Sequence, residues 1–323
     1  MENRSQAKLC PDQVYDEVSI IDYVSGAVEV LLTFVICSGN GLVIVAFLRS
    51  KQMKTMTNYY IFQMAIADCG LGLMLPFHTA TYFLKDVLRD PYVCTLRFVS
   101  LLMMSSASVL LTTSLTLDRY IAIFRPLLYD NEMTRARVTL VTTLTWLLAF
   151  VVSFLIPMFW HNPEYGACTG CIFTRLVNIK YFRYMMIPAA FGALLIQVVL
   201  YLRIFVVAIQ QQTRISEEWR DDNNHLNRSM RKQLKVVKTA FFICLSAFGL
   251  WVPYFIVLAI QVFYPGMLYN DRIKMIRGIA TLMALANAAL NPVIYTLRMA
   301  PFRREIRELL HLQNNKVEHF TLE

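Results

Sequence analysis

The sequence predicts an all-α membrane protein, a bundle of seven transmembrane helices followed by a short amphipathic eighth helix. The chain has 323 residues, of which 57% are hydrophobic and only 16% are charged, so it is more apolar than an ordinary soluble domain. It contains seven predominantly apolar stretches, each long enough to cross a bilayer, which takes roughly 20 helical residues. Because these runs are continuous rather than alternating, they favour helices over a β-barrel.

The expected spans follow one another with mostly short polar links. In chain order they are 26–48, 58–83, 95–124, 138–158, 184–209, 236–263 and 275–297. The alternative is a soluble protein with buried helices, but the links offer too little polar surface to cover so large a core. Residues 1–25 lack the apolar central region of a cleavable signal peptide, so we expect the first span to act as its own insertion signal.

The basic residues orient the bundle. Lys and Arg are retained on the cytoplasmic side, and they gather in the links after the first, third and fifth spans and in the C-terminal segment. We therefore expect a plasma-membrane protein with 1–25 extracellular, 26–297 forming the bundle and 312–323 a cytoplasmic tail. Asn3, in the triplet Asn3-Arg4-Ser5, is a candidate glycosylation site on the outer side.

The segment 298–311 is expected to form the amphipathic helix on the inner leaflet. Its apolar residues recur at helical spacing with arginines between them. The net charge of +9 does not indicate nucleic acid, because the basic residues are grouped on one side of the membrane. We interpret them as topology determinants that face anionic membrane lipids.

A few polar residues lie inside the spans, where lipid makes each of them energetically expensive. Such intramembrane groups are functional candidates by default. They are too sparse to line a wide aqueous pore. The set is Glu29, Asn40, Asp68, Ser105, Ser108, Asn287 and Asn291.

Motifs along the spans resemble those of rhodopsin-like (class A) G-protein-coupled receptors. The resemblance covers residues 26 to 310. Short local motifs are most similar to the branch that holds adenosine, melanocortin and cannabinoid receptors. The motifs are, in order, Gly39-Asn40, Ala67-Asp68, Cys94, Asp118-Arg119-Tyr120, Trp146, Trp251-Val252-Pro253 and Asn291-Pro292-Val293-Ile294-Tyr295.

The resemblance implies a switch that couples the chain to a heterotrimeric G protein. Asp118 would hold Arg119 while the cytoplasmic cavity is closed, and Arg119 would turn inward when the sixth span swings out. The alternative is a purely structural ion pair at the membrane interface that marks the helix end. Many family members clamp the arginine with a further acid where this chain has Gln233, so we expect basal activity. The coupling set is Asp118, Arg119, Tyr120, Leu127, Tyr201, Asn291, Pro292 and Tyr295.

The resemblance also implies a sodium pocket, formed by Asp68, Ser108, Trp251, Asn287 and Asn291. A buried carboxylate is costly unless it is paired, and a small cation with hydroxyl and amide oxygens supplies that pairing. A protonated Asp68 in a hydrogen-bond network is the alternative. We expect no other metal or cofactor.

One disulfide is expected on the outer side. Both Cys168 and Cys171 lie in the link between the fourth and fifth spans, and either can bridge to Cys94 in an oxidising environment. The resemblance favours Cys171. A second bridge between Cys10 and Cys168 stays open, with free thiols as the alternative.

The ligand pocket is expected to be apolar. The resemblance places Leu101 where amine receptors carry an aspartate, and Leu258, Thr174 and Leu285 where adenosine receptors carry purine-binding residues. We therefore expect a mostly apolar small molecule, lipid-like or sterol-like, with a self-activated bundle and a small polar or peptide ligand as alternatives. The pocket set is Leu101, Leu102, Met104, Ser105, Phe173, Trp251, Phe255, Leu258 and Leu285.

Two other functional classes are disfavoured. A transporter typically shows internal repeats or helices broken by Gly and Pro near mid-membrane, and the two halves of this chain show no such pairing. An enzyme would need a nucleophile or a metal cluster at membrane depth, whereas the five histidines are scattered without ligand spacing.

Overall fold

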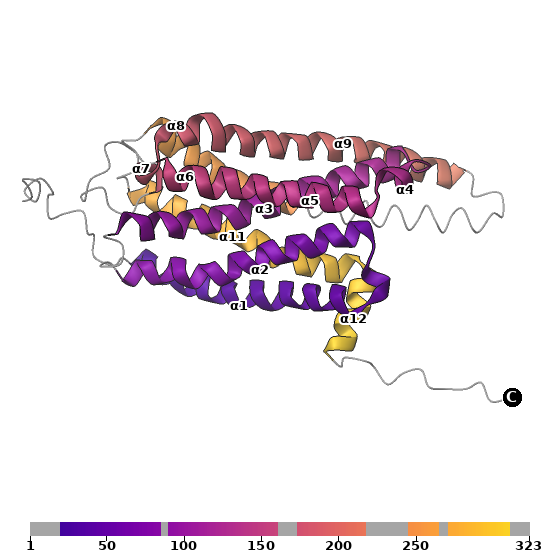
Figure 1. Cartoon of the computed structure of the whole chain (residues 1–323), viewed down its shortest axis with the longest axis horizontal. Helices are drawn as coiled ribbons and strands as arrows, with labels where there is room; N and C mark the ends of the chain where they lie inside the picture. The colour runs from indigo at the N-terminus through magenta and orange to yellow at the C-terminus, as the bar shows by residue number, and fades with distance from the viewer. Residues whose placement is uncertain (1–19, 85–89, 161–172, 218–244, 265–270, 311–323) are drawn as a thin grey trace, which may run out of the picture.

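Seven long helices lie side by side in one bundle in the computed structural model, which describes residues 20–84, 90–160, 173–217, 245–264 and 271–310 (Figure 1). Each is long and apolar enough to cross a membrane. Backbone groups in lipid need partners within their own segment, which a helix provides. The predicted all-α architecture with seven spans is confirmed.

The helices follow the order of the expected spans. The first three spans are α1 (Ile20–Arg49), α2 (Met56–Phe83) and α3 (Pro91–Phe124). The fourth span consists of α5 (Arg135–Phe150), the π-helical turn η5 (Val151–Leu155) and α6 (Ile156–Phe159), and the fifth consists of α8 (Ile179–Tyr181), the π-helical turn η6 (Phe182–Met186) and α9 (Ile187–Glu217). The sixth span is described over Leu245–Phe263, and the seventh is α11 (Asp271–Arg298). Shorter helices are η3 (Lys51–Met53), α4 (Tyr129–Glu132), α7 (Phe173–Leu176) and α12 (Ala300–Leu309). Gln233 and the inner part of the expected sixth span, 236–244, lie outside the described residues.

Polar residues extend several helices beyond the apolar runs that predict them. Asp90 precedes α3, and its Oδ1 accepts hydrogen bonds from the amides of Tyr92 (2.7 Å) and Val93 (3.2 Å). The Thr55 hydroxyl accepts one from the amide of Asn58 (3.3 Å) at the start of α2. These caps satisfy amides that have no partner within their own helix. The helices therefore begin earlier than the apolar runs do.

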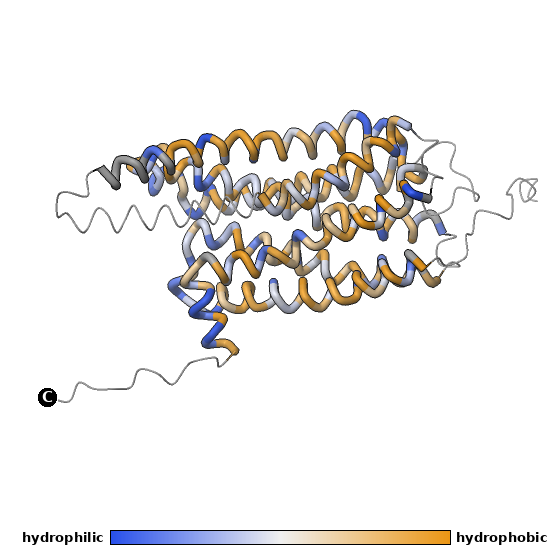
Figure 2. The backbone as a smooth tube through the Cα atoms, turned by 180° about the vertical axis from the view of Figure 1, so that it is seen from behind, coloured by the Kyte–Doolittle hydropathy of each residue, from blue (hydrophilic) through white to orange (hydrophobic). Residues whose placement is uncertain are grey.

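Large apolar side chains cover the outside of the bundle. Phe34 on α1, Leu73 on α2 and Leu195 on α9 are each more than 60% exposed in the bundle itself. Figure 2 shows hydrophobic residues along most of the length of the long helices, with polar residues concentrated toward the ends. Lipid is the environment in which such a surface is stable.

The short helix α12 leaves the bundle at a steep angle after α11 (Figure 1). Phe302 is fully buried, and its ring centroid lies 5.9 Å from that of Tyr295 in α11. Ile306, one turn later, is also buried, whereas Arg303 and Arg304 are exposed. The expected amphipathic helix is therefore present, over Ala300–Leu309 rather than 298–311.

Candidate functional site

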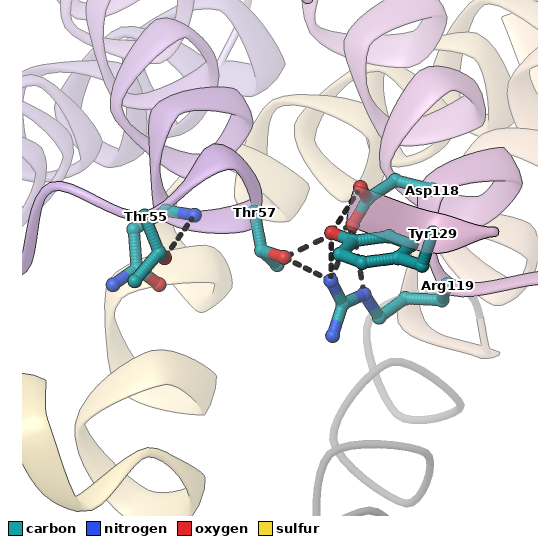
Figure 3. A network of polar contacts seen from close by, with 6 residues as sticks. Thr55, Thr57, Asp118, Arg119 and Tyr129 are labelled. Carbon is teal, nitrogen blue, oxygen red and sulfur yellow. Dashed lines mark hydrogen bonds and ion pairs between the residues drawn. The ribbon is translucent and has the colours of Figure 1, made fainter. Parts of the chain in front are cut away.

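Arg119 lies near the cytoplasmic end of α3, in a network of polar side chains (Figure 3). Its Nε donates a hydrogen bond to Asp118 Oδ2 at 2.9 Å, and its Nη2 donates to the same oxygen at 2.5 Å. Nη2 also donates to the hydroxyls of Thr57 and of Tyr129, the latter at 3.2 Å. Among the described residues, Arg119 is thus bound by its own helix, by α2 and by α4.

Asp118 is the acceptor at the centre of this network. Its side chain is fully buried. Beyond the bonds from Arg119, it accepts one from the hydroxyl of Thr57 (3.0 Å) and one from the hydroxyl of Tyr129 (2.8 Å). Burial, followed by the Asp118 charge, raises the pKa of Tyr129, so the phenol keeps the proton that it donates. The carboxylate thereby joins α2, α3 and α4.

Sequence patterns alone did not single out Thr57 or Tyr129. Thr57 lies in the first turn of α2, and Tyr129 begins a four-residue helix in the link after α3. Neither residue is in the predicted coupling set, and hydroxyls are common at such positions. Only the packing of that link against α2 and α3 brings both to Asp118.

The other predicted coupling residues are spread around Arg119. Tyr120 stacks on Phe124 at 4.3 Å between ring centroids, and Leu127 is 94% exposed in the link after α3. The hydroxyl of Tyr201 in α9 accepts a hydrogen bond from Thr116 (3.3 Å). That arrangement holds Tyr201 one turn away from the arginine along α3.

Asn291, Pro292 and Tyr295 lie on α11. Tyr295 is fully buried, and its hydroxyl lies 3.8 Å from Met64 Sδ. Pro292 packs against Gly39 of α1 so closely that a Cβ at that glycine would lie 3.1 Å from the proline ring. The proline interrupts the hydrogen bonding of α11 at the point where α1 supports it.

Three of the predicted sodium-pocket residues meet at the centre of the bundle. Asp68 in α2 is 1% exposed, and it accepts hydrogen bonds from Ser108 Oγ in α3 (2.7 Å) and Asn291 Nδ2 in α11 (2.8 Å). Trp251 and Asn287 are buried as well. Within the described part of the chain, neither Trp251 Nε1 nor Asn287 Oδ1 has a hydrogen-bond partner. Carboxylate, hydroxyl and amide oxygens are the ligands that a small hard cation prefers.

The predicted ligand-pocket residues divide between two neighbouring apolar clusters. One contains Phe173, Trp251, Phe255 and Leu258, with Leu102 packed against it. The other lies between α1, α2, α3 and α11 and holds the predicted residues Leu285, Leu101 and Met104. Ser105, on α3, is buried as well. A cavity lined by the whole set would therefore span both clusters.

The aromatic cluster has a defined stacking order. The rings of Trp251 and Phe255 stack at 5.6 Å between centroids, and those of Phe98 and Phe173 stack at 4.9 Å. Phe182 in η6 meets Phe173 edge to face at 5.2 Å. Such offset and edge-on pairs are the favourable aromatic geometries. This end of the bundle is thus built from large rings contributed by α3, α7, η6 and the sixth span.

Cys94, at the outer end of α3, is disulfide-bonded. Its predicted partner Cys171 lies outside the described residues, as do Cys10, Cys168 and the candidate glycosylation site Asn3. Cys37 and Cys69 are free thiols on α1 and α2. In the described ranges, no group of three or more His, Cys, Asp or Glu side chains could hold a metal ion.

Glu29 has partners on α2 that the sequence did not indicate. The carboxylate is 1% exposed, and its Oε2 accepts a hydrogen bond from the Thr79 hydroxyl (2.7 Å) and lies 3.0 Å from His78 Nδ1. Consecutive residues of α2 thus both reach the same oxygen. Buried polar groups persist when they are hydrogen-bonded in this way. The cluster ties the outer halves of α1 and α2 together.

Replacing Glu29 with Ala should destabilise the folded protein. The substitution leaves His78 and Thr79 without this acceptor, and a buried polar group that loses its partner costs about 1–3 kcal/mol. We expect a lower unfolding temperature for purified protein, measured by thermal denaturation. Glu29→Gln, which keeps an acceptor oxygen, is the matched control and should lower the unfolding temperature less. An unchanged unfolding temperature for Glu29→Ala would contradict this role.

Comparisons with known proteins agree with this architecture. Residues 39–295 match the family model described as 7 transmembrane receptor (rhodopsin family). The chain is 27% identical to the mouse adenosine receptor A2b over 303 residues, which cover 88% of this chain and 89% of that protein. It is 30% identical to the rat histamine H2 receptor over 295 residues, covering 88% and 79%.

These matches span most of the chain and all the residues of the Asp118 and Asp68 networks. They agree with a multi-pass protein of the plasma membrane that is not an enzyme. The chain belongs to the rhodopsin family of seven-transmembrane receptors, the class A G-protein-coupled receptors.

Proposed function

We propose that this receptor binds an extracellular, mostly apolar small molecule and activates a heterotrimeric G protein through release of Arg119. The observation that carries the proposal is the network around Asp118. A fully buried carboxylate accepts hydrogen bonds from Arg119 and from two hydroxyls, so the guanidinium is held beside its own helix. An arginine held in this way cannot extend into a partner protein.

Release of Arg119 needs these bonds to be exchanged for others. Breaking a buried charge pair is unfavourable by several kcal/mol unless the freed charge finds new partners. A G protein bound at the cytoplasmic face supplies such partners in this proposal. Leu127, 94% exposed a few residues after α3, supports the same face as the contact surface, because it offers an apolar side chain for burial.

The proposed ligand class follows from side chains that face the bundle core. The relatives compared above are named for adenosine and for histamine. At the positions where such receptors bind an amine or a purine, this chain has Leu101, Leu258 and Leu285, and the last two are more than 90% buried. Polar groups of those ligands would lie unsatisfied against leucine, at about 1–3 kcal/mol each. An apolar ligand carries no such penalty.

A sodium ion is the proposed allosteric partner of Asp68. The Ser108 hydroxyl and the Asn291 amide already bind the carboxylate, and the Asn287 Oδ1 is a buried acceptor without a described partner. These residues fit a small cation: Asp68 would supply the charge, and Ser108, Asn287 and Asn291 would supply neutral oxygens. A bound ion would favour the closed arrangement of the helices.

The first experiment measures cyclic AMP in cells that express increasing amounts of the receptor, without any ligand. We expect a change that grows with expression and that Arg119→Ala abolishes at equal surface level. Such a change supports basal coupling through Arg119. An identical response from the Arg119→Ala variant would contradict the proposed switch. A response that no candidate ligand modifies would favour a self-activated bundle.

A further inference from the structure

Several polar atoms at the outer end of the bundle are buried without a partner. They are Thr95 Oγ1 in α3, Thr174 Oγ1 in α7, Arg183 Nε in η6 and Gln261 Nε2 in the sixth span, and none has a hydrogen-bond partner among the described residues. Thr95 and Gln261 are at least 95% buried as whole residues. Native proteins leave few buried polar atoms unpaired, so each needs an explanation.

The residues that carry these atoms lie on the extracellular side of the aromatic cluster. On α3, Thr95 precedes Phe98 and Leu102 by about one and two helical turns, which places the three on one face. On the sixth span, Gln261 follows Leu258 by about one turn, and its neighbour Val262 follows Phe255 by about two. Thr174 is adjacent to Phe173, which stacks on Phe98. The unpaired atoms therefore form the outer edge of the apolar cluster.

The chemistry of the unpaired atoms defines the missing group. Gln261 Nε2 and Arg183 Nε can only donate hydrogen bonds, and the two threonine hydroxyls can donate as well as accept. What would satisfy all of them is therefore a hydrogen-bond acceptor. Water could supply such an acceptor as well. An acceptor on a ligand would differ from water in that it pairs these atoms only when the ligand is bound.

Arg183 adds a positive charge to this edge. Its Nη2 donates to the carbonyl oxygen of Val262 at 3.2 Å, and its guanidinium lies 5.6 Å from the ring centroid of Phe263. Val262 belongs to the same buried cluster as Phe255 and Leu258. The guanidinium is thus fixed at the end of the sixth span, by the residue that follows Gln261 in the chain. A negatively charged acceptor is favoured there over a neutral one.

We propose that the ligand is an amphiphile with an oxyanion head, a carboxylate or a phosphate, bound by Gln261, Arg183, Thr95 and Thr174. Its apolar body extends inward along Leu258 and Phe255 toward Trp251. This inference rests on the proposed apolar ligand and names the head group that such a ligand carries. The apolar body is buried by the rings and leucines, and the head fills the hydrogen-bonding capacity left open above them.

The test uses receptor purified into phosphatidylcholine nanodiscs and the probes oleic acid, oleoyl lysophosphatidic acid and oleyl alcohol. The readout is the rise in unfolding temperature as each probe is added. We expect both anionic probes to stabilise the receptor and oleyl alcohol to do so about tenfold less potently. Gln261→Leu should weaken the effect of the anionic probes about tenfold and leave the alcohol unchanged.

A matched variant separates this role from simple packing. Gln197, also buried, donates to Thr113 Oγ1 at 2.7 Å and to the Val109 carbonyl at 3.3 Å. Gln197→Leu should lower the unfolding temperature of the ligand-free receptor, because it breaks hydrogen bonds that are already made. Gln261→Leu should leave that temperature unchanged or raise it, because it removes an amide that is unsatisfied without ligand.

Three outcomes would overturn the inference. Oleyl alcohol as potent as oleic acid, with no effect of Gln261→Leu, would leave an apolar ligand without the proposed head group. Gln261→Leu as destabilising as Gln197→Leu in the ligand-free state would make Gln261 a packing residue. No stabilisation by any probe, in a receptor whose basal signalling still depends on Arg119, would refute the amphiphile and leave G-protein coupling in place.

Discussion

Replacing Asp118 with Asn should raise ligand-independent signalling about tenfold at equal surface expression. Asparagine keeps the size of the side chain and removes the charge that binds Arg119 Nε and Nη2. Hydrogen bonds to a charged group contribute about 1.5–3 kcal/mol, against about 1 kcal/mol for a neutral pair. The closed state therefore loses roughly 1.4 kcal/mol, which corresponds to a tenfold shift in the equilibrium.

Loss of either hydroxyl partner of Asp118 should raise basal signalling by a smaller amount. Tyr129→Phe removes the donor to Asp118 Oδ1, and Thr57→Val removes the donor to Oδ2, so each should raise basal signalling less than Asp118→Asn. The double variant Asp118→Asn with Arg119→Ala should be silent. The measurement is second-messenger accumulation against surface level. Basal signalling of Asp118→Asn equal to that of the parent receptor would show that the pair does not restrain the closed state.

Replacing Asp68 with Asn should abolish the effect of sodium on basal signalling. In membranes of the parent receptor, exchanging sodium chloride for N-methylglucamine chloride should raise nucleotide exchange on the G protein about tenfold, if sodium is present at about ten times its dissociation constant. Asp68 is the charged group of the buried cluster with Ser108 and Asn291. Its neutral isostere should give the same exchange rate in both salts.

Glu29→Gln provides the matched control for that experiment. It neutralises another carboxylate that is 1% exposed, but one bound to Thr79 and His78 on the α1 and α2 side. We expect it to keep the full sodium response. A parent receptor that responds to pH and not to sodium would favour the alternative of a protonated Asp68. Asp68→Asn that keeps the sodium response would exclude Asp68 as the ion's ligand.

The number, order and type of the helices follow from the sequence because lipid imposes a single requirement on every span. Twenty or so apolar residues must be helical to satisfy their backbone there. The helix ends are less predictable, since caps such as Asp90 extend α3 beyond its apolar run. The π-helical turns η5 and η6 leave no mark in hydropathy, and they are visible only in the structure.

Site residues are predictable where one motif residue meets another. Asp68 meets Asn291, as their motifs imply, and Arg119 meets Asp118. Partners supplied by packing escape such reasoning: Tyr129 comes from a short link, and the pairing of His78 with Glu29 depends on how two helices face each other. Gln261 is similar, because only its burial without a partner distinguishes it from other glutamines.

The contacts between α1 and α2 continue along much of their length. Beyond the Glu29 cluster, the thiols of Cys37 and Cys69 each lie 3.9 Å from the other residue's carbonyl oxygen. A Cβ at Gly72 would lie only 2.8 Å from Cys37 Sγ, so side chains of α1 pack directly against the glycine of α2 there. Separating them would break contacts at several heights at once. We therefore expect these two helices to move as one unit, and a ligand to shift the remaining helices against them.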